Sequence, residues 1–136
     1  MFERKDIAKL KKDIVLDIEL FNSNLKLHTR WGTFSPRALD DGTKLLMKHF
    51  SADIDDVCLD LGCGYGPIGL ALAKHCTRGE VHMVDKDFVA VDLANYNAKL
   101  NNIVNAKAYL SDAFLQVPSD IKFNQIVSNI PAKVGR

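Results

Sequence analysis

The sequence lacks a long hydrophobic run, and no apolar stretch follows its charged N-terminus. This predicts no signal peptide, no membrane partner and a cytoplasmic location. Cysteine is also scarce: Cys58, Cys63 and Cys76 form no CxxC pair, which argues against a disulfide framework and predicts no metal site. The 18 basic and 17 acidic residues nearly cancel, giving a net charge of +1 and no strong electrostatic footprint for nucleic acid.

The chain has 136 residues, of which 47% are hydrophobic. This length and content predict one domain, large enough to bury a core without disulfides or metals. Within it, we expect residues 1–50 to form an N-terminal hairpin and helix and residues 51–136 to form a core of alternating strands and helices.

The first fifty residues hold two strand-like runs, 14–20 and 25–30, separated by polar turn residues. This pattern predicts a β-hairpin. Ser35 followed by Pro36 then indicates a helix start, with serine as N-cap and proline in the first turn. We expect this helix to continue to about His49.

From Ser51 onward, apolar strand-like runs alternate with helical ones. The expected strands are 57–61, 80–84, 107–110 and 123–128, and the expected helices are 67–75 and 87–101. Alternation at this spacing predicts an α/β fold with a doubly wound parallel sheet and right-handed crossovers. The second helix is expected to turn five apolar residues inward: Phe88, Val91, Leu93, Ala94 and Ala98.

A glycine loop, Gly62–Gly66, follows the first of these strands. Glycines let the backbone turn sharply and approach a ligand, and the next helix points its N-terminus at the same space. The segment GYGPIG, residues 64–69, matches the dinucleotide pattern G-x-G-x-x-G, but Asp60 lies just before the loop. A carboxylate repels a pyrophosphate and attracts the ammonium and sulfonium of S-adenosyl-L-methionine, so we predict the latter cofactor, held with Cys63 and the loop glycines. The alternative is that Asp60 binds loop amides.

Two further acids follow later strands. Asp85 comes 19 residues after Gly66, near the spacing at which an acid accepts both ribose hydroxyls. Its alternative role is an N-cap, which Asp87 could supply instead. Asp112 follows the third strand and either accepts from the adenine amino group or lies in a surface turn. Lys86, beside Asp85, is placed in the same cofactor site.

Three stretches together resemble the class I S-adenosylmethionine-dependent methyltransferases, specifically the "methyltransferase small" group, which includes guanine-N2 methyltransferases of ribosomal RNA. They are DLGCGYGPIGLALA (60–73), LHTRWGTFS with LDDGTKLL (27–35 and 39–46), and SNIPAKVG (128–135). The resemblance implies a Rossmann-like fold, an RNA substrate and methylation of a base amine. Protein or small-molecule N-methylation, or a cofactor-binding module without turnover, are the alternatives.

The resemblance also implies roles for single residues. Phe34 would lie over the cofactor, although it could equally plug the core under the hairpin. Asn129, Ile130 and Pro131 match the catalytic motif N-P-P, in which Asn129 also contacts the cofactor. Ile130 replaces the first proline, and Ala132 replaces the aromatic residue that follows. A strand-ending turn is the other interpretation of this segment.

The family fold continues beyond the fourth motif with further helices and three strands, which are absent from these 136 residues. The resemblance therefore predicts a chain holding the first four core strands, in which strand 123–128 is an exposed edge open to self-association. Such a chain should bind cofactor better than it catalyses.

Overall fold

The structure is a computed structural model that describes residues 13–20, 23–30 and 51–128. Several predictions fall outside these ranges: the N-terminal segment 1–12, the helix over 35–49, Phe34, and the motif Asn129, Ile130 and Pro131.

Four parallel strands form the central sheet: β3 (Val57–Leu61), β4 (Glu80–Asp85), β5 (Ala106–Leu110) and β6 (Gln125–Ser128). Their order is β5-β4-β3-β6, so the chain starts in the middle, moves to one side and then crosses to the other. This is the arrangement of a Rossmann-like sheet, whose carboxyl ends meet at one edge beside the central strands. The predicted fold class is confirmed.

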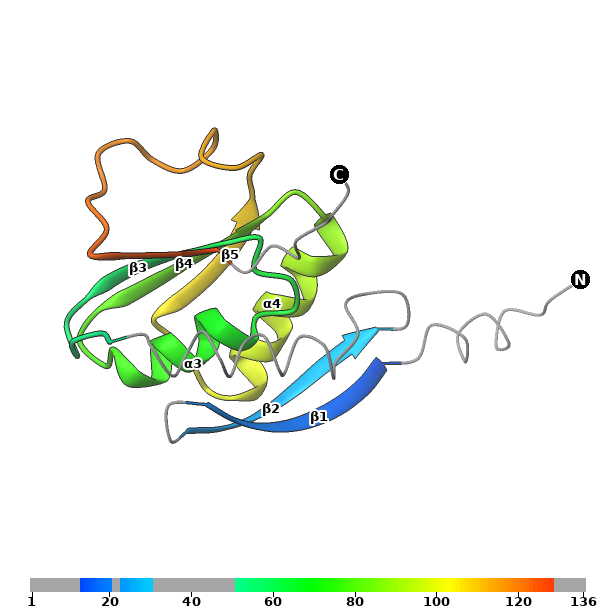
Figure 1. Ribbon diagram of the computed structural model, residues 1–136. Coiled ribbons are helices and arrows are strands. Elements are labelled where there is room, and N and C mark those ends of the chain that lie inside the picture. The colour runs from blue at the N-terminus through cyan, green and yellow to red at the C-terminus, as the bar shows by residue number, and fades with distance from the viewer. Residues whose placement is uncertain (1–12, 21–22, 31–50, 129–136) are drawn as a thin grey trace, which may run out of the picture.

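Helices α3 (Pro67–His75) and α4 (Phe88–Leu100) make the two crossovers and lie on the same face of the sheet (Figure 1). α3 is buried from Pro67 to Ala73 because the hairpin covers the side that the sheet does not. One inward prediction for α4 is wrong: Phe88 is 67% exposed. It lies in the first turn of α4, and none of the described elements covers it there.

The hairpin consists of β1 (Asp13–Leu20) and β2 (Ser23–Arg30), paired antiparallel with Leu20 opposite Ser23. β1 ends where the sequence predicted, whereas β2 begins two residues earlier, within the predicted turn. Leu25 and Leu27 of β2 are buried, and β2 packs against both helices. The helices thus lie between the hairpin and the sheet, as Figure 1 shows.

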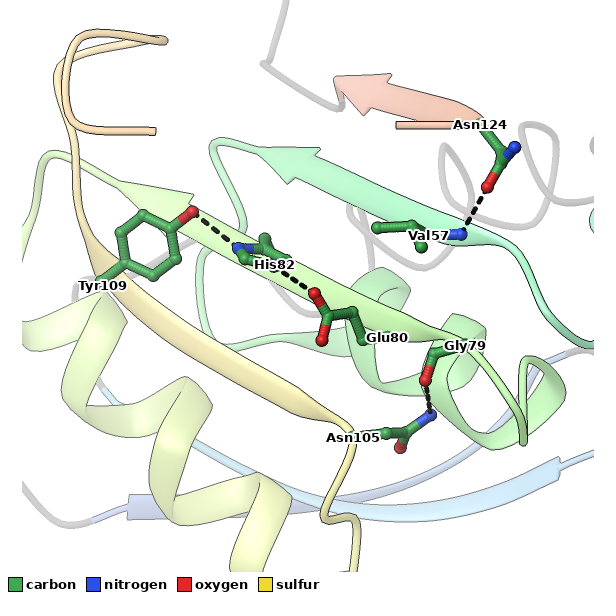
Figure 2. A network of polar contacts seen from close by, with 7 residues as sticks. All are labelled: Val57, Gly79, Glu80, His82, Asn105, Tyr109 and Asn124. Carbon is green, nitrogen blue, oxygen red and sulfur yellow. Dashed lines mark hydrogen bonds and ion pairs between the residues drawn. The ribbon is translucent and has the colours of Figure 1, made fainter. Parts of the chain in front are cut away.

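On the other face of the sheet, buried His82 connects two strands (Figure 2). Its ring nitrogens lie 2.8 Å from the Tyr109 hydroxyl and 2.9 Å from a Glu80 carboxylate oxygen. The ring of Phe123 approaches His82 edge-on, at 5.4 Å between centroids. Phe123 was predicted to begin a strand, but it serves instead to anchor the segment before β6 on this face.

Asn124, also predicted to be in that strand, ends the segment by pairing with Val57 at the start of β3. Its side-chain oxygen accepts from the Val57 amide at 2.7 Å, and its own amide donates to the Val57 carbonyl at 2.7 Å. The side chain substitutes for a strand neighbour, so β6 begins one residue later.

Candidate functional site

The glycine loop joins β3 to α3 at the carboxyl edge of the sheet. Gly62, Gly64 and Gly66 have φ angles of 70°, 57° and 100°. All three values lie where a side chain would be strained, which explains a glycine at every second position. The amides of Gly62 and Cys63 both donate to the carbonyl of Val84, at 2.8 and 2.9 Å, and hold the loop against the end of β4.

Asp60 lies in β3 directly beneath this loop and is 1% exposed. Neither carboxylate oxygen has a hydrogen-bonding partner among the described residues. The alternative role for Asp60, binding loop amides, is therefore wrong. α3 passes very close: a Cβ on Gly69 would lie 3.0 Å from Asp60 Oδ2 and 2.5 Å from Met83 Cγ.

Burial raises the pKa of Asp60 from 3.8 to about 7, and the negative charge of Asp85 acts in the same direction. The backbone amide of Gly69 opposes the shift, although it does not reach hydrogen-bonding geometry. A buried carboxylate without a partner is destabilising, and such groups in proteins commonly face a ligand. A cation placed near Asp60 would favour its charged form.

Asp85 is the last residue of β4 and is half-buried. One carboxylate oxygen accepts from the Gly64 amide and the other from the Asp87 amide, both at 2.9 Å. The N-cap of α4 is Asp87, whose side chain accepts from the Val89 amide at 2.9 Å. The N-cap alternative for Asp85 is therefore wrong. Each carboxylate oxygen of Asp85 can accept a further hydrogen bond.

Cys63 and Tyr65 are both buried loop residues. Burial and the neighbouring carboxylates raise the pKa of the Cys63 thiol well above its usual range, and its sulfur lies 3.4 Å from the Gly64 carbonyl. This is the setting of a packing residue, not of a nucleophile. Tyr65 is 1% exposed despite its glycine neighbours, because its side chain belongs to the same hydrophobic core as Leu25 and Leu27 of β2.

Lys86 and Asp112 are exposed and follow β4 and β5 at the carboxyl edge. The Asp112 amide donates to the side-chain oxygen of Gln116 at 2.8 Å, which fixes the turn after β5. Both residues thus lie at the carboxyl edge of the sheet, where the glycine loop follows the neighbouring strand β3. Their contacts with a ligand stay predictions.

Asn97 is a residue of this site that the sequence analysis missed. It lies fully buried on α4 and donates to the carbonyl of Tyr65 at 2.8 Å. A signal was available: Asn97 falls three residues after Ala94, on the apolar stripe of the helix, where an amide requires buried partners.

Across residues 13–20, 23–30 and 51–128, no three His, Cys, Asp or Glu side chains gather closely enough to hold a metal ion. None of the helices described there has the length and hydropathy needed to cross a bilayer. The site itself contains two carboxylates, of Asp60 and Asp85, and the glycine loop. This set suits an organic ligand that carries positive charge and hydroxyl groups.

Comparisons with known proteins agree with this geometry. The model of the methyltransferase small domain matches residues 24–136. YbxB, an uncharacterized protein of Bacillus subtilis (strain 168), is 40% identical over 118 residues, which are 86% of this chain and 59% of that protein. Ribosomal RNA small subunit methyltransferase C of Haemophilus influenzae (strain PittEE) is 33% identical, over 98% of this chain and 38% of the relative.

Among solved structures, the 16S rRNA methyltransferase RsmC of T. thermophilus, in complex with AdoMet and guanosine, superposes with a TM-score of 0.80 at 26% identity. The match covers 91% of this chain and 34% of that one. The chain thus spans between about a third and three-fifths of the length of these relatives. Since the family model matches most of the sequence, the chain belongs to the methyltransferase small domain family.

Proposed function

We propose that this chain binds S-adenosyl-L-methionine at the glycine loop. The observation that carries the proposal is Asp60, a buried carboxylate with no hydrogen-bonding partner in the described part of the chain. The sulfonium and ammonium of this cofactor supply positive charge, whereas the pyrophosphate of a dinucleotide would add negative charge beside Asp60 and Asp85. AdoMet in the superposed T. thermophilus methyltransferase supports the same choice.

The remaining residues of the site are proposed to bind the ribose and adenine parts of the cofactor. Asp85 would accept the ribose hydroxyls with the acceptor capacity that its two backbone contacts leave. Asp112 would accept from the adenine amino group, with Lys86 beside the ribose. The loop from Gly62 to Gly66, including Cys63, would pass closely over the cofactor because it carries few side chains. Phe34 is proposed to cover the other side.

We further propose that the protein methylates a base amine of ribosomal RNA. The bound cofactor supplies an electrophilic methyl group. The Asn129 side-chain oxygen and the Ile130 carbonyl would accept the two hydrogens of the amine, whose nitrogen is thereby oriented for attack. Pro131 favours an extended Ile130 and so directs that carbonyl. This is mainly a positioning effect. The rRNA methyltransferases among the relatives support the substrate class.

Cofactor binding is tested by titration calorimetry with S-adenosylmethionine, S-adenosylhomocysteine and NAD. We expect binding of the first two and none of NAD. Asp85→Asn should weaken S-adenosylhomocysteine about tenfold or more, because charge-assisted hydrogen bonds contribute about 1.5–3 kcal/mol each. The matched control is Asp87→Asn, which changes a neighbouring carboxylate that caps α4. NAD binding alone would contradict the proposal.

The substrate is tested by transfer of a radiolabelled methyl group to bulk ribosomal RNA, with nucleoside analysis of the product. Label on a base amine, lost in Asn129→Ala, is the expected result for the whole protein. Label on protein or a small molecule would favour the alternative N-methyltransferase. Tight cofactor binding without any transfer would favour a binding module.

We also propose that the protein acts in the cytoplasm, where ribosomal RNA is available.

The free side of β6 lies at the end of the described sheet, and Ile126 on this strand is 53% exposed. An edge of this kind favours pairing with a second strand. Self-association of the chain through β6 should appear as concentration-dependent sedimentation, which Ile126→Lys should reduce.

A further inference from the structure

Asn97 of α4 and Asn101, the C-cap that follows the helix, bind the backbone of the hairpin in the same way. The Asn97 side chain accepts from the His28 amide at 2.8 Å and donates to the His28 carbonyl at 2.9 Å. One helical turn later, the Asn101 side chain accepts from the Lys26 amide at 2.9 Å and donates to the Lys26 carbonyl at 2.9 Å. Each primary amide thus pairs with β2 as a neighbouring strand would.

This geometry has a simple physical reason. β1 pairs with one edge of β2, and the amides and carbonyls on the other edge require partners where the hairpin packs on the helices. Residues four apart on a helix lie on one face, and alternate residues of a strand point their backbone groups to one edge. Asn97 and Asn101 therefore match Lys26 and His28 in spacing.

The two asparagines differ in their third contact. The amide nitrogen of Asn101 also donates to the carbonyl of Asn97, within α4, at 2.8 Å. The amide nitrogen of Asn97 donates instead to the carbonyl of Tyr65, between Gly64 and Gly66, at 2.8 Å. Asn97 is fully buried, and these bonds occupy both of its N–H donors and its oxygen.

We propose that Asn97 is a positioning residue that couples the docking of the hairpin to the conformation of the cofactor loop. Gly64 and Gly66 leave the loop backbone free to adopt other conformations, and the bond to Tyr65 restricts that freedom from one side. Because the same amide binds His28, one side chain contacts both the loop and β2. The link to cofactor affinity rests on the proposed function.

Coupling of this kind is reciprocal. A ligand that requires the observed loop conformation should strengthen the docking of β2, and loss of docking should weaken the ligand. Asn101 provides a matched control, since it makes the same pair with the hairpin and its third hydrogen bond goes to Asn97 instead of the loop.

The experiment compares Asn97→Ala with Asn101→Ala. Hydrogen exchange of the Gly64 and Gly66 amides reports on the loop, exchange of the Lys26 and His28 amides reports on the hairpin, and calorimetry gives the affinity for S-adenosylhomocysteine. We expect Asn97→Ala to speed exchange in the loop and to weaken affinity at least tenfold. Asn101→Ala should speed exchange of Lys26 while leaving affinity within about twofold.

In the parent chain, S-adenosylhomocysteine should slow exchange of the His28 amide, a measurement that needs no variant and holds even if Asn97→Ala fails to fold. Equal affinity and equal loop exchange in the two variants would overturn the proposal, as would an unchanged His28 amide in the ligand-bound parent. If the parent binds no S-adenosylhomocysteine, the proposed function fails. The coupling is then decided by whether loop exchange is faster in Asn97→Ala than in Asn101→Ala.

Discussion

Helices α3 and α4 both connect parallel strands and both pack between the sheet and the hairpin, but their N-termini differ. α4 begins after Asp87, which caps it through the Val89 amide. α3 begins after Gly66, which has a left-handed backbone and no side chain that could cap the helix. The first turn of α3 also has no acidic residue, although Asp60 lies buried beneath it.

Three asparagine side chains, two on α4 and one directly after it, are matched to backbone groups of the protein. Asn95 accepts from the amide of Ala108 at 2.9 Å and donates to its carbonyl at 3.0 Å. Asn97 and Asn101 form the same pair of hydrogen bonds with backbone groups of β2. Beside α3, the two oxygens of Asp60 lack such partners in the described residues. The polar groups of these asparagines near α4 thus find their hydrogen-bonding partners within the protein. The carboxylate of Asp60, beside the N-terminal half of α3, is instead available to a bound ligand.

The largest expected effect is the pH dependence contributed by Asp60. The pKa of the Asp60 carboxyl group rises from its ordinary value of 3.8 to about 7 in the folded protein. Between these values the unfolded chain has released the proton while the folded chain keeps it, so the free energy of unfolding falls as pH rises and levels off above about 7. The full difference corresponds to about 4 kcal/mol. Asp60→Asn should lose this slope, as measured by urea unfolding at pH 4–8.

The matched control is Asp87→Asn, where the lost carboxylate has a backbone partner. The change of slope in Asp60→Asn should exceed that of the control. Saturating S-adenosylmethionine should flatten the slope of the parent, because a cation beside Asp60 favours the charged form. If the free energy of unfolding depended on pH equally in the parent and in Asp60→Asn, the prediction for Asp60 would be contradicted.

The second effect concerns the loop that precedes α3. Gly66 has a φ of 100°, and an added Cβ would lie 3.1 Å from the Leu70 Cδ1 atom. Gly66→Ala should lower the free energy of unfolding by about 1–2 kcal/mol through backbone strain, and should weaken S-adenosylhomocysteine strongly because the loop must shift. Cys63→Ala, in the same loop at a residue without positive φ, is the control. Calorimetry showing equal affinities for both variants would contradict the prediction.

Much of the fold could be predicted because local and global signals agree. Pro67 begins a helix, the residues up to Ala73 are apolar, and the structure has α3 over the predicted range. The loop before it could be predicted because only glycine tolerates its backbone. Asp85 could be placed at the edge of the sheet because the spacing from the loop is set by one helix and one strand.

The misses share a different origin. Phe88 was wrongly predicted to face inward because helical spacing does not reveal which element covers a side chain. The role of Asn97 depends on β2, which lies 69 residues away in the sequence. Asn124 pairs with Val57 through its side chain, at a separation of 67 residues. Such contacts are determined by packing between layers, which periodicity along one element does not encode.

A third and smaller effect should appear at α4. Asp87→Ala removes the hydrogen bond to the Val89 amide and should lower the free energy of unfolding by about 1 kcal/mol, the usual contribution of an N-cap. The affinity for S-adenosylhomocysteine should change little, because this end of α4 is satisfied by its own side chain. Asp87→Ser, which can still cap, should recover most of the stability. A large loss of affinity in Asp87→Ala would show that both helix ends serve the ligand.

The smallest effect is kinetic and concerns the thiols. Cys63 lies in the glycine loop, Cys58 in β3 and Cys76 at the end of α3, and all three are buried. Burial raises the pKa of Cys58 to about 12 and also raises that of the other two thiols. Alkylation by iodoacetamide at pH 8 should therefore be slow and should require opening of the structure.

The comparison of the two helix N-termini predicts which thiol becomes accessible to the reagent first. The loop before α3 has few side chains because three of its five residues are glycine, whereas Cys58 can react only when the central strand separates from its neighbours. Site-resolved mass spectrometry should find Cys63 labelled faster than Cys58, and S-adenosylhomocysteine should slow Cys63 by a larger factor, since the ligand stabilises the closed loop. Equal rates at both sites, with equal protection by ligand, would mean that the loop and the sheet open as one unit. The loop would then not be a distinct, ligand-dependent region, contrary to what Asp60 of β3 indicates through a carboxylate that has no hydrogen-bonding partner among the described residues.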